Sequence, residues 1–379
     1  MAPELALSSV SRADGEPILD PMCGSGMVLK AALQAGKQAI GFDLDPLAVL
    51  MSRVWTTAAP DDLEGCAASV IARANTISVP DLPWIDFDHE TAEFVDFWFG
   101  KTQQHDLRKI AAVLWELDDS AEHNALRLAL SRTIITKDRG ASLASDVSHS
   151  RPHRTRTTND YDVISGFKLA ARNVGRILAV SSTSGAASVS LGDARDLKGL
   201  PDNSAGMIVT SPPYLNAIDY LRGHRLALVW LGYRVGDLRA VRSSSIGAER
   251  GLSEESIEAE LRDIIRELSI DEYDRQLGRM LVRYFFDLDR MMAEASRVLK
   301  HGSDAVFVVG NSTIRSQFVD NATLTARAAE RHGLRLVDRS ERELPANRRY
   351  LPPPRINASD QLSRRMRTEV ILRLSKSAA

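Results

Sequence analysis

The first 45 residues contain the pattern that most restricts the fold of this chain. Residues 17–20 (PILD) form a short apolar run that ends in an acid, and the turn PMCGSG and a helical stretch over 28–35 follow it. A second apolar run, QAIGFDLD, also ends in acids. A strand, a glycine turn, a helix and another strand predict a parallel sheet with helices on its faces.

The strand pattern stops after this opening and resumes much later. From about 61 to 177 apolar residues recur at helical spacing, which predicts a helical insertion. Residues 221–281 are predicted to be a second, charged helical segment. The remaining strands are expected over 187–191, 206–210, 305–309, 334–338 and 369–374, with helices over 285–299 and 322–331.

Composition limits the class of protein. Of the 379 residues, 44% are hydrophobic and 26% charged, as in ordinary globular proteins. No membrane span or secretory signal is expected. Two cysteines, Cys23 and Cys66, are too few for a disulfide framework or a four-cysteine zinc site, so the sequence predicts a cytoplasmic protein without a metal. The net charge of −2 excludes a uniformly basic surface.

The glycine turn has the features of a ligand-binding loop. Gly24 and Gly26 allow the backbone to approach a ligand closely. The turn lacks the third glycine of the dinucleotide fingerprint and the Lys-Ser/Thr pair of a phosphate loop. A ligand with a carboxylate would suit the helix N-terminus. The alternative is a plain turn between strand and helix.

Acids follow two further strands. Asp43 lies 17 positions after Gly26, near the offset of about 20 residues at which an acid binds ribose hydroxyls. Asp45 is interpreted as a turn residue. Asp193, in GDA, could accept a hydrogen bond from an adenine amine or cap a turn.

The segment TSPPY, residues 210–214, directly follows an apolar strand. Two prolines restrict φ and remove two N–H donors, so nearby carbonyls can accept hydrogen bonds from an exocyclic amine. Tyr214 offers an aromatic face on which a flipped base can stack. The alternative is a loop with a core tyrosine.

In this order, DPMCGSG, GFDLDP, GDA and TSPPY resemble the amino-methylating class of S-adenosylmethionine-dependent DNA methyltransferases. The resemblance covers about 17–58 and 187–311. Met22 and Met27 stand where the family usually has Phe and Thr. The resemblance implies an α/β fold, a Rossmann-like class I methyltransferase with a seven-stranded, mostly parallel sheet. Its catalytic domain would be split into 1–58 and 180–379, with 59–179 as the helical insertion.

The resemblance also implies roles for particular residues. S-adenosylmethionine would be bound by Asp20, Pro21, Cys23, Gly24, Gly26, Asp43 and Asp193. The target base would be held by Ser211, Pro212, Pro213 and Tyr214, and methylated by direct displacement after base flipping, without a cysteine nucleophile. The Ser-Pro-Pro-Tyr form resembles the cytosine-N4 subgroup.

Three other activities stay open at this point. They are DNA adenine-N6 methylation, RNA guanine-N2 methylation and a catalytically silent binding subunit. The last is motivated by the roughly 16 residues before the first strand, where the family usually has a strand and a helix. DNA is the expected partner, with a cognate restriction or defence protein as a second candidate.

A basic stretch is the candidate for DNA contacts. Residues 131–156 contain six Lys or Arg against two Asp, an excess of four positive charges. Contacts between positively charged side chains and DNA phosphates set the register of a protein on DNA. The candidates are Arg139, Arg151, His153, Arg154 and Arg156. The alternative is a solvated loop, and a second group of arginines lies within 348–367.

Overall fold

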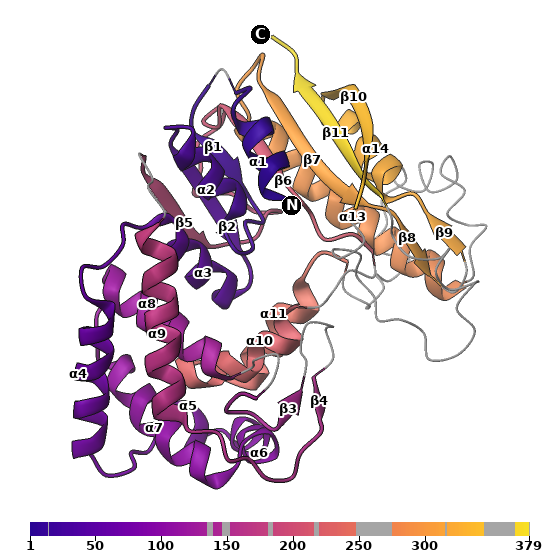
Figure 1. Cartoon of the computed structure of the whole chain (residues 1–379). Coiled ribbons are helices and arrows are strands. Elements are labelled where there is room, and N and C mark those ends of the chain that lie inside the picture. Colours follow the sequence, from indigo (N-terminus) through magenta and orange to yellow (C-terminus); the bar gives the residue numbers. More distant parts are fainter. Residues whose placement is uncertain are drawn as a thin grey trace. The chain divides into compact units, whose positions relative to one another are not determined.

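The computed structural model describes residues 1–13, 15–134, 139–145, 152–180, 185–215, 220–247, 275–314, 317–344 and 368–378 (Figure 1). The chain forms two compact units, which we call the sheet unit and the helical unit. The sheet unit comprises Met1–Leu44, Ser184–Ala217 and Ser243–Ala379, and the helical unit comprises Asp45–Thr183 and Ile218–Arg242. The helical unit is therefore built from two insertions into the sheet unit.

Seven strands form the main sheet, in the order β10-β11-β7-β6-β1-β2-β5. Strands β1, β2, β5, β6 and β7 pair in parallel, whereas β11 pairs antiparallel with β7 and β10. This topology confirms the predicted α/β, mostly parallel, seven-stranded fold. The strands are β1 Ile18–Asp20, β2 Ala39–Asp43, β5 Ala187–Leu191, β6 Met207–Thr210, β7 Asp304–Gly310, β10 Leu334–Glu343 and β11 Thr368–Lys376.

Helices cover both faces of this sheet. Ile18 and Leu19 are successive residues of β1, so their side chains point to opposite faces, and both are fully buried. Burial on both faces explains why the parallel strands are continuous apolar runs rather than alternating ones. On one part of the sheet α2 (Met27–Gln34) packs against β1 and β2, and α1 (Pro3–Val10) packs against α2.

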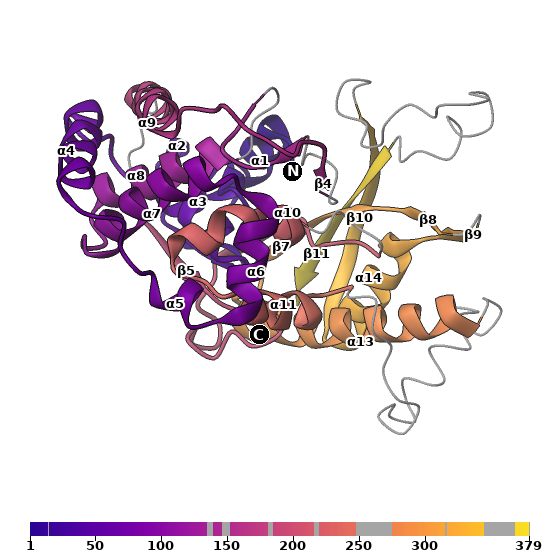
Figure 2. The same cartoon turned by 90° about the horizontal axis from the view of Figure 1, so that it is seen from below.

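The other helices of the sheet unit are α13 (Arg275–Val298) and α14 (Asn321–Arg331), which pack against each other (Figure 2). Their apolar side chains share one core with Phe307 of β7. A short hairpin, β8 (Ser312–Ile314) and β9 (Gln317–Val319), follows β7.

Four features of the sheet unit differ from the sequence prediction. Strand β10 extends to Glu343, five residues beyond the predicted end at 338. The helix α1 and the β8–β9 hairpin were not predicted, and α13 begins ten residues before the predicted start at 285. The first turns of α13 carry several arginines among the apolar residues, which obscures its apolar stripe. Leu277 and Leu281 nevertheless lie one turn apart and are buried.

The helical unit has its own core. Phe99 and Trp230 meet edge to face with ring centroids 5.0 Å apart, and Phe167 is fully buried. Aspartates 45, 62, 88 and 162 cap the first turns of α3, α4, α6 and α9 with their side chains. The elements are α3 Pro46–Thr56, α4 Leu63–Thr76, α5 Pro83–Asp86, α6 His89–Trp98, α7 Lys101–Trp115, α8 Ala121–Ile134, β3 Ala144–Ser145, β4 His153–Arg154, α9 Val163–Ala179, α10 Tyr220–Leu228, η1 Val229–Leu231 and α11 Val235–Ser244.

The described residues of the helical unit are mainly helical. The basic stretch 131–156, for which a solvated loop was the alternative, contains the β3–β4 pair in its described part. The sequence prediction sets the boundaries of the insertion at 59 and 179 and keeps 221–281 in the catalytic domain. In the structure the helical unit instead comprises Asp45–Thr183 and Ile218–Arg242. No helix in the described ranges combines the length and the hydropathy that a bilayer span requires.

Candidate active site

The glycine turn between β1 and α2 is held against the end of β2. Gly24 and Gly26 have φ angles of 52° and 81°, in the left-handed region that favours glycine. The N–H of Cys23 donates to the Phe42 carbonyl at 2.8 Å, and the N–H of Gly26 donates to the Cys23 carbonyl at 2.8 Å. Pro21 and Cys23 are buried, so they form the base of the turn.

Asp43 completes this turn. The N–H of Gly24 donates to Asp43 Oδ2 at 2.8 Å, which joins the carboxyl end of β2 to the loop after β1. Asp45 instead caps α3, because the N–H of Leu47 donates to its Oδ1, and His224 Nδ1 lies 2.5 Å from its Oδ2. Asp45 is therefore a helix N-cap whose side chain is 13% exposed, rather than a solvated turn residue.

A buried hydrogen bond joins the glycine turn to the proline segment. Strands β1 and β6 are neighbours, and the Thr210 hydroxyl donates to Asp20 Oδ1 at 2.7 Å. The Met22 N–H donates to the same oxygen at 3.2 Å, so neither bond uses Oδ2. Burial raises the pKa of the Asp20 carboxyl to about 7, against the effect of these two hydrogen bonds. Two motifs 190 residues apart thus meet at one carboxylate.

The Ser-Pro-Pro-Tyr segment leaves the end of β6 beside β7. The Ser211 hydroxyl donates to the Val308 carbonyl at 2.9 Å. A hydroxyl has one hydrogen and two lone pairs, so this bond leaves the Ser211 oxygen as an acceptor for another group. Pro212 is buried, whereas Pro213 and Tyr214 are partly exposed. Tyr214 packs against the core that α13 shares with the sheet.

Asp193 is held by its neighbour in the sequence. Arg195 Nε and Nη2 donate to the Asp193 carboxylate at 3.0 and 2.6 Å. Burial acts to raise the pKa of Asp193, but the hydrogen bonds and the charge of Arg195 outweigh it and lower the pKa below its usual value. Asp193 is therefore an ionised acceptor at neutral pH.

The DNA-binding candidates belong to the helical unit. Arg139 forms an exposed ion pair with Asp160 at 3.1 Å. His153 and Arg154 form β4, and the Arg154 guanidinium lies 4.8 Å from the ring centroid of Phe97. Arg156 is partly exposed. Arg151 and the arginines within 348–367 lie outside the described residues.

Sequence reasoning missed several residues of the site. Thr210 was seen only as the first letter of a motif, and Arg195 directly follows the GDA motif without a recognised role. Phe97, which is 49% exposed and lies beside Arg154, was also missed, because nothing in the sequence indicated that pairing. In the described ranges, no three His, Cys, Asp or Glu side chains gather in a group that could hold a metal ion.

Gly24→Ala is expected to destabilise the protein by about 1–2 kcal/mol, because an L-residue is disfavoured in the left-handed region. The cost should be conformational, since an added Cβ would meet nothing within 4 Å. Urea unfolding at neutral pH would measure it. Gly199→Ala is the matched control, because Gly199 has the same open space but no positive φ. Equal stability of the two variants would contradict this account.

Comparisons with known proteins find similar sequences. The chain is 22% identical to the Type II methyltransferase M.MvaI of Kocuria varians over 411 aligned positions, which cover 99% of this chain and 88% of that protein. The chain is similar to Type II methyltransferases. It is also 29% identical over 153 positions to the Type II methyltransferase M.AvaI of Nostoc sp., covering 35% of this chain and 31% of that protein.

No protein-family profile matches the chain. Among solved structures, a SAM-dependent methyltransferase of Methanosarcina mazei gives a TM-score of 0.33 at 9% identity, covering 96% of this chain and 92% of that one. A protein of Thermus thermophilus assigned as a DNA modification methylase, solved with S-adenosyl-L-methionine, gives a TM-score of 0.24 at 18% identity, covering 50% and 52%.

Proposed function

We propose that this protein transfers a methyl group from S-adenosylmethionine to an exocyclic amine of a base in DNA, with cytosine N4 as the favoured position. The hydrogen bond from Thr210 to Asp20 carries this proposal, because it holds the Ser-Pro-Pro-Tyr segment beside the glycine turn. The similarity to a Type II methyltransferase along 99% of the chain supports it independently.

The residues present fit the cofactor. Open space lies where a Gly24 side chain would be, so a ligand can approach that backbone. Asp20 precedes the turn, Pro21, Cys23, Gly24 and Gly26 belong to it, and Asp43 is bonded to it. The carboxylates of Asp20 and Asp43 would accept from the amino group and the ribose hydroxyls, and Asp193 from the adenine amine. S-adenosylmethionine would supply an electrophilic methyl group on sulfur.

The proline segment suits an amine substrate. Because the Ser211 hydroxyl donates to Val308, its oxygen can accept a hydrogen bond from the target amine. Neither Pro212 nor Pro213 has an N–H that would compete for the Pro212 carbonyl. Tyr214 would stack on the flipped base. Alignment of the amine with the methyl group can supply about 7–11 kcal/mol of a reaction barrier.

The helical unit would provide DNA contacts. Arg139, Arg151, His153, Arg154 and Arg156 are the proposed residues. Arg154 and Phe97 together offer a charge and an aromatic face, both of which nucleic acids bind. A cognate restriction protein is a further proposed partner.

The test is mass analysis of nucleosides after incubation with methyl-labelled S-adenosylmethionine and unmethylated DNA, with transfer RNA in parallel. Labelled N4-methylcytosine that disappears in Ser211→Ala would support the proposal. Labelled N6-methyladenine would keep the reaction and overturn the choice of base. Label only in RNA guanine would overturn the choice of polymer. No label, with no calorimetric binding of cofactor, would favour a silent subunit.

A further inference from the structure

Arg195 is a buried cation to which the proposed function assigns no role. Its side chain is 6% exposed, and all three guanidinium nitrogens have partners within the sheet unit. Nε and Nη2 donate to Asp193, Nη1 donates to Asp287 Oδ1 at 2.5 Å, and Nη2 also donates to the carbonyl of Ser244. One side chain therefore joins the loop after β5 to α13 and to Ser244, the last residue of α11, which belongs to the sheet unit.

This arrangement is specific to a guanidinium. Asp287 is 2% exposed and also accepts from Arg283, one turn earlier in α13. Buried charges are tolerated only when they are paired and hydrogen-bonded. A lysine would keep the positive charge but could not reach three groups with the planar fork of an arginine.

Arg195 also controls how many acceptor sites Asp193 retains. Asp193 Oδ1 accepts from the Arg195 backbone N–H at 2.9 Å and from Nε at 3.0 Å, and Oδ2 accepts from Nη2 at 2.6 Å and from the same Nε at 3.2 Å. These bonds come from only three N–H groups, because Nε is shared between the two oxygens. A carboxylate offers about four lone-pair sites, so it has room for about one further donor. The Asp193 side chain is 27% exposed, which leaves it accessible to a ligand. One remaining acceptor suits one N–H donor.

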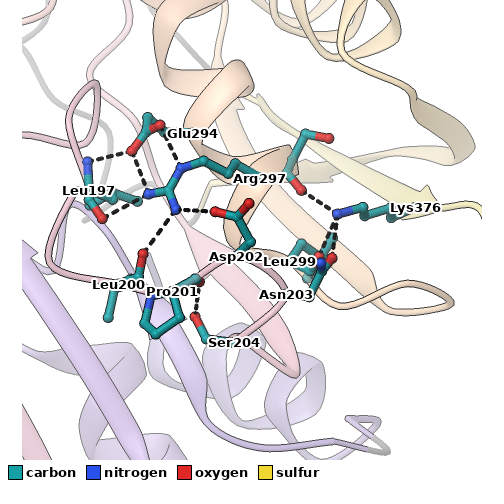
Figure 3. Close-up of polar contacts among 11 residues, drawn as sticks. Leu197, Leu200, Pro201, Asp202, Asn203, Ser204, Glu294, Arg297, Leu299 and Lys376 are labelled. Atoms are coloured by element: carbon teal, nitrogen blue, oxygen red, sulfur yellow. Dashed lines mark hydrogen bonds and ion pairs between the residues drawn. The ribbon is translucent and has the colours of Figure 1, made fainter.

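The rest of the same loop is attached to α13 separately (Figure 3). Glu294 accepts from the Leu197 N–H at 2.6 Å, and Arg297 donates to the Leu197 and Leu200 carbonyls and to Asp202. This second attachment does not touch Asp193. It therefore provides a natural control for effects that come only from anchoring the loop.

We propose that Arg195, held by Asp287, is a positioning residue that makes Asp193 a selective acceptor for the 6-amino group of the cofactor adenine. The inference rests on the proposed function, because it requires the cofactor to bind beside Asp193. Arg195 acts through Asp193 and does not touch the reacting atoms.

The test compares two ligands that differ at the 6-position of the purine. S-adenosylhomocysteine has an amine there, whereas S-inosylhomocysteine has an oxo group. Calorimetry should give a tighter Kd for the amino ligand in the wild type, by about 10- to 100-fold for a hydrogen bond to a charged group. This preference should fall to within about threefold in Arg195→Lys and in Asp287→Asn, as in Asp193→Ala.

The control is Glu294→Gln, which weakens the second attachment of the loop. It should change the affinity for both ligands by the same factor and leave their ratio intact. If Arg195→Lys does not fold, Asp287→Asn gives the same comparison with a smaller change in side-chain structure. Circular dichroism would establish that each variant is folded.

The outcomes separate this inference from the proposed function. A wild type that binds neither ligand would overturn the proposed function. A wild type that binds both ligands equally would leave cofactor binding intact and overturn the inference. A preference that survives in both Arg195→Lys and Asp287→Asn would also overturn it, because Asp193 would then read the amine without Arg195.

Discussion

Tyr214→Ala is expected to lower kcat/KM for DNA methylation by about 100-fold, because aromatic stacking contributes about 1–3 kcal/mol per base. Tyr214 packs partly against the core near α13, and the remainder of its surface is exposed. The residues proposed to bind the cofactor lie on the glycine turn and its neighbours, so the affinity for S-adenosylmethionine should stay within about twofold. Steady-state methylation of DNA and calorimetry with the cofactor would measure the two effects separately.

Tyr214→Phe is the matched control. It keeps the ring and removes only the hydroxyl, so it should retain most of the activity if stacking is the role. Full activity of Tyr214→Ala would contradict a contact between this residue and the base. An equal loss of cofactor affinity would instead indicate that Tyr214 supports the whole site.

Asp20→Asn is expected to stabilise the protein by about 2–4 kcal/mol at pH 8, while it weakens cofactor binding. Burial raises the pKa of Asp20 from 3.8 to about 7, so the folded state binds a proton more tightly than the unfolded state does. The contribution of the protonated Asp20 carboxyl to the free energy of unfolding is therefore fully present below about pH 4 and is lost as the pH rises through 7. Each pKa unit corresponds to about 1.4 kcal/mol.

Urea unfolding of both proteins at several pH values would test this. The asparagine oxygen can still accept from Thr210 and Met22, so the hydrogen bonds of Asp20 have a substitute. The stability gap between variant and wild type should be smallest near pH 4 and should level off above pH 7. A gap that does not change with pH would show that Asp20 is ionised in the folded state throughout this range.

The central part of the fold could be predicted because its signals are local. β1, the glycine turn and β2 lie within 30 residues, and β5 was predicted with its observed bounds. The short helix α1 has eight residues and no long amphipathic pattern. Its formation depends on packing against α2, which a local pattern does not contain.

The contacts that assemble the site could not be predicted in the same way. Asp287 lies 92 residues from Arg195, and Val308 lies 97 residues from Ser211. Each of these pairings depends on strand order and on which face of a helix meets the sheet. Motifs indicated which residues carry chemistry, whereas only the folded chain gives the partners that orient them.

The two insertions that build the helical unit leave the sheet unit just after Asp43 and shortly after Tyr214. In the described residues the helical unit supplies no strand to the seven-stranded sheet. Its two segments could therefore diverge or be exchanged as a cassette without altering any pairing between strands. Under the proposed function, such an architecture would let DNA sequence preference change without altering the residues proposed for methyl transfer.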